Sequence, residues 1–155
     1  TDGEALERAL QVNVVGPLRI SRLVVPSMVL RGEGLVVAVT SDASVNAYPG
    51  WGAYGVSKAA LDHLGRVLAA ELDGTGVRVL TVDPGEMDTQ MHADAVPEAD
   101  RTSLLDPRVV ADRVVRLVRH AGALASGARV EASGWRDGEP KAPPATGADA
   151  PRRPA

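Results

Sequence analysis

Cysteine and phenylalanine are absent from this chain of 155 residues, and its only aromatic residues are two Trp and two Tyr. Without cysteine the chain has no disulfide, thiolate metal site or cysteine nucleophile. This composition is typical of a reducing compartment, so we expect a cytoplasmic protein. The formal net charge of −3 lacks the basic excess of nucleic-acid-binding proteins. No apolar run approaches the ~18 residues that span a bilayer, so we expect no membrane partner either.

Three stretches of the chain have the apolar spacing of helices. Apolar residues recur every three or four positions over 2–31 and over 53–72, and a third pattern covers 107–121. Thr1 and Glu4 fit a capping box at the start of the first stretch. Each of these stretches is long enough to cover one face of a sheet.

Short valine-rich runs lie between the helical stretches. The continuous apolar run 35–40 is typical of a parallel strand that is covered on both faces. The run 77–82 predicts a second strand, which Pro84-Gly85 ends, and 127–132 predicts a weaker third strand. The order helix–strand, repeated three times, predicts an α/β fold of Rossmann type, a three-layer sandwich around a parallel sheet. We expect one domain over 1–133. Residues 134–155 hold five of the eleven prolines and are predicted to be a disordered tail.

Two residues that open the second helical stretch have complementary chemistry. Tyr54 and Lys58 are four residues apart and share one helix face. An ammonium beside a phenol favours the phenolate, which makes a proton donor and acceptor. Ser41, just after the first strand, lies at the sheet edge where functional groups of such folds gather, and it could hold a substrate oxygen. A Tyr/Lys pair at this spacing is also an ordinary surface contact, so the assignment depends on the motifs around it.

Asn13 is a candidate for a different reason. Pro17 has no N–H, so the carbonyl of Asn13, four residues earlier, loses its helical partner. A freed carbonyl at such a point can hold an ordered water. The alternative is that Pro17 only bends the helix.

Eight short motifs follow one another along the chain. They are Asn13-Val-Val-Gly16, Pro26-Ser-Met28, Thr40-Ser41, Pro49-Gly50, Tyr54-Gly-Val-Ser-Lys-Ala-Ala60, Leu68-Ala-Ala-Glu-Leu72, Val77-Arg-Val79 and Pro84-Gly-Glu-Met-Asp-Thr89. In this order, and with thirteen residues from Ser41 to Tyr54, the series resembles the classical short-chain dehydrogenases/reductases. The resemblance covers about residues 2–133.

This resemblance implies hydride transfer between a nicotinamide cofactor, NAD or NADP, and a small carbonyl or alcohol substrate. Tyr54 would be the general acid/base, Lys58 would favour its phenolate and bind the nicotinamide ribose, Ser41 would orient the substrate, and Asn13 would hold a water of the proton relay. The implied cofactor-binding residues are Tyr54, Lys58, Pro84, Gly85, Met87 and Thr89. The expected substrate pocket contains Asp42, Tyr48, Trp51 and Met91.

The chain departs from the family at its amino-terminal side. The family's glycine-rich strand–turn–helix and its Asn-Asn-Ala-Gly segment are not in the sequence. We therefore expect this chain to be the carboxyl-terminal half of the domain, with the amino-terminal cofactor-binding strands missing. Since those strands carry the residues that distinguish NAD from NADP, the sequence does not choose between the two cofactors. The alternative function is a non-catalytic remnant that only associates with other subunits.

Two further expectations concern partners and metals. The resemblance implies a homo-oligomer built through helices 2–31 and 53–72. Asp88 and His92 have the spacing of metal ligands on one helix face, but no third ligand lies near them in the sequence, so we expect no metal.

Overall fold

Three parallel strands form the sheet of the computed structural model, which describes residues 1–135. The strands are β1 (Gly34–Val39), β2 (Val77–Asp83) and β3 (Arg129–Glu131), in the order β1-β2-β3. In their register Val37 lies opposite Leu80, and Val82 lies opposite Val130. The predicted parallel sheet is confirmed, with strand ends displaced by one or two residues. The predicted tail lies outside the described residues from residue 136 onward.

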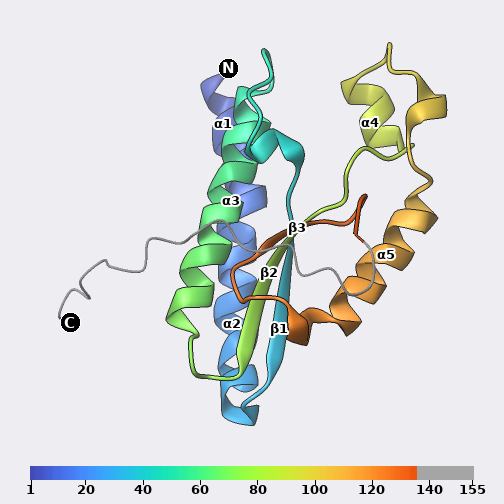
Figure 1. The fold of residues 1–155 in the computed structure, drawn as a ribbon. Coiled ribbons are helices and arrows are strands. Elements are labelled where there is room, and N and C mark those ends of the chain that lie inside the picture. Colours follow the sequence, from blue (N-terminus) through green and yellow to red (C-terminus); the bar gives the residue numbers. More distant parts are fainter. Residues whose placement is uncertain (136–155) are drawn as a thin grey trace.

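Helices cover both faces of this sheet. They are α1 (Gly3–Leu10), α2 (Gly16–Arg31), α3 (Gly52–Glu71), α4 (Gln90–Ala95) and α5 (Pro107–Arg119), with single 3-10 turns at Asp42–Ser44, Arg101–Ser103 and Ala121–Ala123. Figure 1 shows α1, α2 and α3 together on one side of the strands and α5 on the other. The predicted three-layer sandwich is therefore confirmed. None of the helices within residues 1–135 is long and apolar enough to cross a membrane.

Alternation along β2 explains why both faces need a cover. Leu80 and Val82 are almost completely buried in a cluster that includes Val110 and Leu117 of α5. Thr81, between them in sequence, is turned to the other face, where α3 passes so closely that Gly65 is the residue in contact. A strand with apolar side chains on both faces is stable only between two helical layers.

The long first helix is not continuous. A π-helical turn at Gln11–Val15 separates α1 from α2, and the N–H of Gly16 bonds to the carbonyl of Gln11, five residues back. The turn lies directly before Pro17, which has no N–H to continue the ladder. Such turns often occur at functional sites, and this one contains Asn13.

Carboxylate caps begin two of the helices. Asp2 caps α1 by accepting a hydrogen bond from the N–H of Ala5, so the predicted cap at Thr1 is wrong by one residue. Asp is a better acceptor than Thr next to the helix dipole, which favours this start. Asp106 caps α5, which begins at Pro107 as predicted.

Candidate active site

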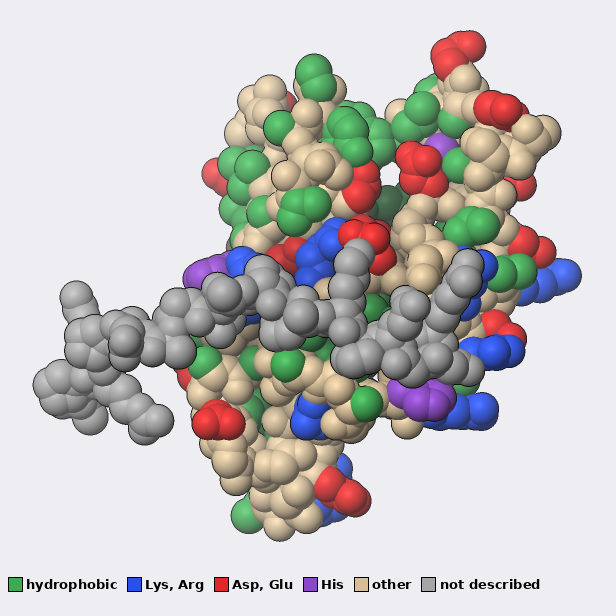
Figure 2. All heavy atoms as spheres, viewed as in Figure 1, with side chains coloured by type: hydrophobic (Ala, Val, Ile, Leu, Met, Phe, Trp, Pro, Cys, Tyr) green, Lys and Arg blue, Asp and Glu red, His purple; other side chains and the backbone are tan. Residues whose placement is uncertain are grey.

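A pocket of about 570 Å³ opens where β1 and β2 end. Figure 2 shows the surface hollowed between the α1–α3 layer and the α4 lobe, with hydrophobic and acidic side chains around the opening. The lining residues come from the β1 end, the start of α3 and the segment after β2. They are Val39, Thr40, Ser41, Asp42, Gly50, Trp51, Ala53, Tyr54, Lys58, Asp83, Pro84, Gly85, Glu86, Met87, Thr89, Met91, His92 and Ala95.

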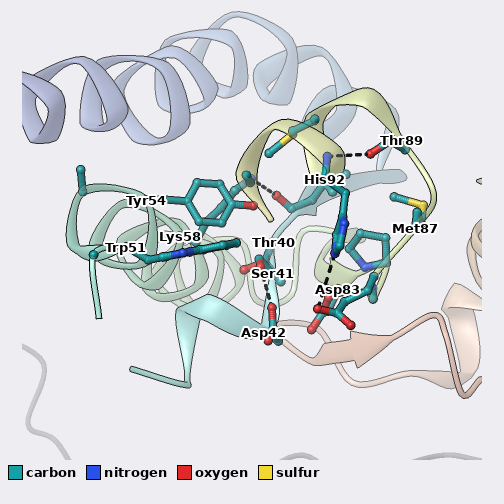
Figure 3. A pocket seen from close by; sticks show the side chains of 18 residues that line it. Thr40, Ser41, Asp42, Trp51, Tyr54, Lys58, Asp83, Met87, Thr89 and His92 are labelled. Carbon is teal, nitrogen blue, oxygen red and sulfur yellow. Dashed lines mark hydrogen bonds and ion pairs between the residues drawn. The ribbon is translucent and has the colours of Figure 1, made fainter. Parts of the chain in front are cut away.

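Tyr54 and Lys58 line one wall of this pocket from successive turns of α3 (Figure 3). The Nζ of Lys58 lies 5.6 Å from the centre of the Tyr54 ring. It also donates a hydrogen bond to the backbone carbonyl of Val39 at 2.9 Å. Trp51 packs edge-on against Tyr54, with ring centres 5.9 Å apart. The Tyr54 ring thus contacts both an indole and an ammonium on this wall of the pocket.

Burial changes the proton affinity of Lys58. Desolvation lowers the pKa of its ammonium from the ordinary 10.5, and the nearby carboxylate of Asp62 opposes that shift. The ammonium has three N–H donors, and Val39 uses one of them. Lys58 can therefore offer further donors to a ligand in the pocket.

Ser41 and Asp42 form the floor of the pocket at the end of β1. The Ser41 hydroxyl donates to Asp42 Oδ1 at 3.0 Å and accepts from the N–H of Ala43 at 3.2 Å. Tyr48 donates to Asp42 Oδ2 at 2.5 Å. Burial by itself raises the pKa of the Asp42 carboxyl, but these hydrogen bonds outweigh burial and bring the pKa below 3.8. The same bond raises the pKa of the Tyr48 phenol.

The wall opposite Tyr54 is built by the turn after β2 and by α4. Gly85 has a φ of 76°, a conformation that favours glycine, and its N–H bonds to Asp83 Oδ1 at 2.9 Å. Thr89 caps α4 by accepting from the N–H of His92 at 3.2 Å. Met87 and His92 face the pocket from this side (Figure 3).

Asn13 reaches the site indirectly. Its Nδ2 donates to the hydroxyl of Ser57 at 2.9 Å, and that hydroxyl donates to the backbone carbonyl of Tyr54 at 2.7 Å. Asn13 does not line the pocket; it lies in a second cavity between α2, α3 and β1. Within this helical layer, the π-helical turn is therefore tied by hydrogen bonds to α3, the helix that carries Tyr54.

Comparison with known proteins shows the family. A model of the short chain dehydrogenases matches residues 1–100. The chain belongs to the short-chain dehydrogenase family. It is 36% identical over 132 residues to the benzil reductase ((S)-benzoin forming) of Saccharomyces cerevisiae, a match that covers 72% of this chain and 49% of that protein. It is 35% identical over 127 residues to the glycine betaine reductase of Emericella nidulans, covering 77% of this chain and 10% of that one.

Solved structures of short-chain dehydrogenases share this fold. A short-chain type dehydrogenase/reductase from Mycobacterium ulcerans superposes with a TM-score of 0.73 at 30% identity, covering 84% of this chain and 51% of that one. A short chain dehydrogenase from Salmonella enterica serovar Typhi gives a TM-score of 0.73 at 26% identity, covering 84% and 54%. The chain thus spans about half the length of these two structures and of the benzil reductase. Family membership supports an oxidoreductase function.

Ten of the residues predicted for a short-chain dehydrogenase site line one pocket. They are Ser41, Asp42, Trp51, Tyr54, Lys58, Pro84, Gly85, Met87, Thr89 and Met91. Tyr48 does not line it; its hydroxyl bonds to Asp42 and its ring packs against Trp51, and both of these residues line the pocket. Of the pair with metal spacing, Asp88 binds Arg101 at 2.6 Å, and His92 lies 3.7 Å from Glu86. Within residues 1–135 no three His or carboxylate side chains gather as a metal site.

Two acidic residues that line the pocket, Asp83 and Glu86, were not predicted as site residues. Their positions directly before Pro84 and directly after Gly85 were an available signal, because neighbours of a motif at a strand end share its edge. Arg129 pairs with both Asp62 and Asp83, and no sequence pattern signalled that Arg129 and Asp62 lie beside the pocket.

Proposed function

We propose that the natural protein containing this chain is an NAD(P)-dependent oxidoreductase that interconverts a carbonyl compound and its alcohol. The observation that carries the proposal is the convergence of Tyr54, Lys58 and Ser41 on one pocket. Each comes with the chemistry such a reaction needs: a proton donor, a cation beside it, and a hydroxyl that can bind the same oxygen.

The pocket also suits a nicotinamide cofactor. Lys58 has N–H donors beyond the one that Val39 takes, and these fit the hydroxyls of a ribose. Pro84, Gly85 and Thr89 would border the nicotinamide, because they form the wall opposite Tyr54. When bound, the cofactor supplies or accepts the hydride. NAD and NADP both remain open as the cofactor.

The side chains would handle the proton and the oxygen. For reduction, the Tyr54 hydroxyl gives its proton to the carbonyl oxygen, and Lys58 stabilises the phenolate that remains. Ser41 would exchange its bond with Asp42 for one to the substrate oxygen and so fix the substrate's orientation. Asn13, through Ser57, would hold the Tyr54 segment and the water from which the proton is replaced.

We also propose that the substrate is neutral or cationic. Trp51, Met87 and Met91 provide apolar walls, while Asp42 and Glu86 add negative charge on the substrate side. Lys58, the lining cation beside Tyr54, would be taken by the cofactor. A carboxylate substrate would meet like charges in a confined space, which disfavours it.

The test is a turnover assay with the natural protein, following reduced nicotinamide by absorbance. Ketones and aldehydes of one size are offered as neutral, cationic and carboxylate forms. We expect NADH- or NADPH-dependent reduction of the first two classes. In Tyr54→Phe we expect turnover to fall by about 100-fold or more with melting temperature and cofactor affinity nearly unchanged. A variant that keeps more than about a tenth of the activity would remove Tyr54 from the proton transfer. No turnover with any carbonyl or alcohol would contradict the oxidoreductase itself.

Self-association remains a separate proposal. Exposed apolar side chains gather on α2, where Ile20, Leu23 and Leu30 are 62%, 81% and 89% exposed. They support the predicted homo-oligomer through the helices of 2–31 and 53–72. Light scattering on the natural protein and on Leu23→Glu tests this; an unchanged molar mass in the variant would contradict it. An oligomer that lacks turnover would favour the association module over the enzyme.

A further inference from the structure

A guanidinium and two carboxylates form a buried cluster next to the pocket, beside the carboxyl end of β2. Arg129 of β3 donates from Nη2 to Asp83 Oδ2 at 2.7 Å and to the backbone carbonyl of Ser41 at 3.2 Å. Its Nε lies 3.4 Å from Oδ2 of Asp62 on α3, an ion pair in which the Nε makes no hydrogen bond. We call Arg129, Asp62 and Asp83 the Arg129 cluster.

These charges are largely removed from water. The side chains of Asp62 and Asp83 are 5% and 6% exposed, and that of Arg129 is 17% exposed. Desolvation cancels much of the attraction in such a pair, so well-packed apolar residues often stabilise a fold equally well. Stability alone therefore does not explain why charged residues occupy these positions, whereas the directions of their hydrogen bonds do.

Each member of the cluster reaches a segment that forms the pocket. Asp83 Oδ1 accepts the N–H of Gly85 at 2.9 Å, on the turn after β2. Asp62 Oδ2 accepts the hydroxyl of Ser44 at 2.6 Å, in the loop after β1. The guanidinium holds the Ser41 carbonyl in the same loop. One planar side chain thus fixes the positions of the loop after β1, the turn after β2 and helix α3 relative to one another. The N–H groups of a guanidinium point in fixed directions, whereas the ammonium of a lysine does not impose such angles on its partners.

We infer that Arg129 is a positioning residue, which holds the Ser41 carbonyl and thereby sets the Ser41 hydroxyl against Tyr54 in the pocket. The inference rests on the proposed function, because it requires that Ser41 and Tyr54 bind one substrate oxygen. Arg129 does not line the pocket, so its effect on turnover passes through Ser41. A displacement of about 1 Å at such a group can cost about 100-fold in rate.

A double-mutant cycle on the natural protein separates positioning from general stability. The variants are Arg129→Lys, Ser41→Ala and the double variant, and Arg119→Lys on the exposed face of α5 is the matched control. We expect Arg129→Lys to lower kcat by about tenfold or more, with KM for the cofactor within about twofold. In the Ser41→Ala background the same change is expected to lower kcat by less than about twofold, because the group it positions is gone. Arg119→Lys leaves every value unchanged.

The possible outcomes distinguish failure of the positioning role of Arg129 from failure of the proposed function. If the wild type turns over and Arg129→Lys lowers kcat equally in the wild type and in Ser41→Ala, the positioning role is overturned while the proposed function stands. Unchanged kcat in Arg129→Lys does the same. If Arg129→Lys does not fold, the cycle is run with Arg129→Gln, which keeps N–H donors without the charge; failure of both to fold overturns the inference, because Arg129 then supports the whole fold. Absence of wild-type turnover contradicts the proposed function, and the inference falls with it.

Discussion

Lys58 Nζ donates a hydrogen bond to the carbonyl of Val39 at 2.9 Å, which joins helix α3 to the last residue of β1. The bond sets the ammonium beside the Tyr54 ring while the rest of its hydrogen-bonding capacity faces the pocket. A cation held by the backbone keeps its place without a carboxylate directly on it, which would compete with a phenolate for its charge.

Lys58→Met is expected to weaken cofactor binding and also to alter the pH profile. The methionine fills similar space but has no ammonium. The loss of activity that follows deprotonation of Lys58, whose pKa is lowered by burial, is therefore expected to disappear from the alkaline limb. Calorimetric cofactor titration and kcat/KM against pH measure the two effects. Unchanged affinity together with an unchanged profile would make Lys58 a surface residue.

Asp62→Asn is expected to move the profile in the opposite direction. Burial lowers the pKa of Lys58 below 10.5, and the Asp62 carboxylate opposes this by raising it. Activity that needs the ammonium falls as pH rises through the pKa of Lys58. Without the carboxylate that pKa is lower, so the loss begins at lower pH.

The measurement is kcat/KM across alkaline pH, with Asp73→Asn in the exposed turn after α3 as the control. An alkaline limb in Asp62→Asn that coincides with those of the wild type and Asp73→Asn would show that the two groups are not coupled.

Tyr48→Phe should raise the pKa of Asp42. Burial raises that pKa and the hydrogen bonds lower it, with the phenol of Tyr48 the largest of them, so loss of the phenol moves it upward. A carboxylate with a lowered pKa stabilises the fold above its unfolded value near 3.8, and this contribution is lost as pH falls through the folded value. That contribution is therefore smaller in the variant. NMR titration of the Asp42 carboxyl measures the change, with Asp100 as the internal reference. Equal Asp42 titration curves in the wild type and in Tyr48→Phe would contradict the hydrogen bond from Tyr48 to Asp42.

Gly65→Ala should destabilise the fold by about 1–3 kcal/mol, because overpacking a tight contact strains both partners. A Cβ at Gly65 would lie 2.7 Å from Cγ2 of Thr81 on β2. Gly122→Ala is the control, since nothing lies within 4 Å of its added Cβ. Thermal and denaturant unfolding measure the difference. Thr81→Ser removes the opposing methyl and is expected to recover much of the loss; equal stability of the two alanine variants would refute the close contact.

Much of the architecture follows from local patterns. The run around Val37 is apolar throughout, and the run around Leu80 is rich in valine; short runs of this kind are typical of strands that are buried on both faces. Asp106-Pro107 signals a helix start because each residue is suited to its place at the cap. The π-helical turn was not predicted. Pro17 indicates that one backbone N–H of the helix is missing, but not that the N–H of Gly16 would bond to the carbonyl five residues back instead of four.

By itself the sequence determined that Tyr54, Lys58 and Ser41 are the candidates for the chemistry, since the spacing of Tyr54 and Lys58 puts both on one helix face and the motif order places Ser41 at a strand end. Only the tertiary structure decided what surrounds them. Arg129 meets Asp83 from 46 positions away and Ser41 from 88 positions away. No periodicity links such positions, because a parallel sheet brings strand ends together only after the intervening helices have packed.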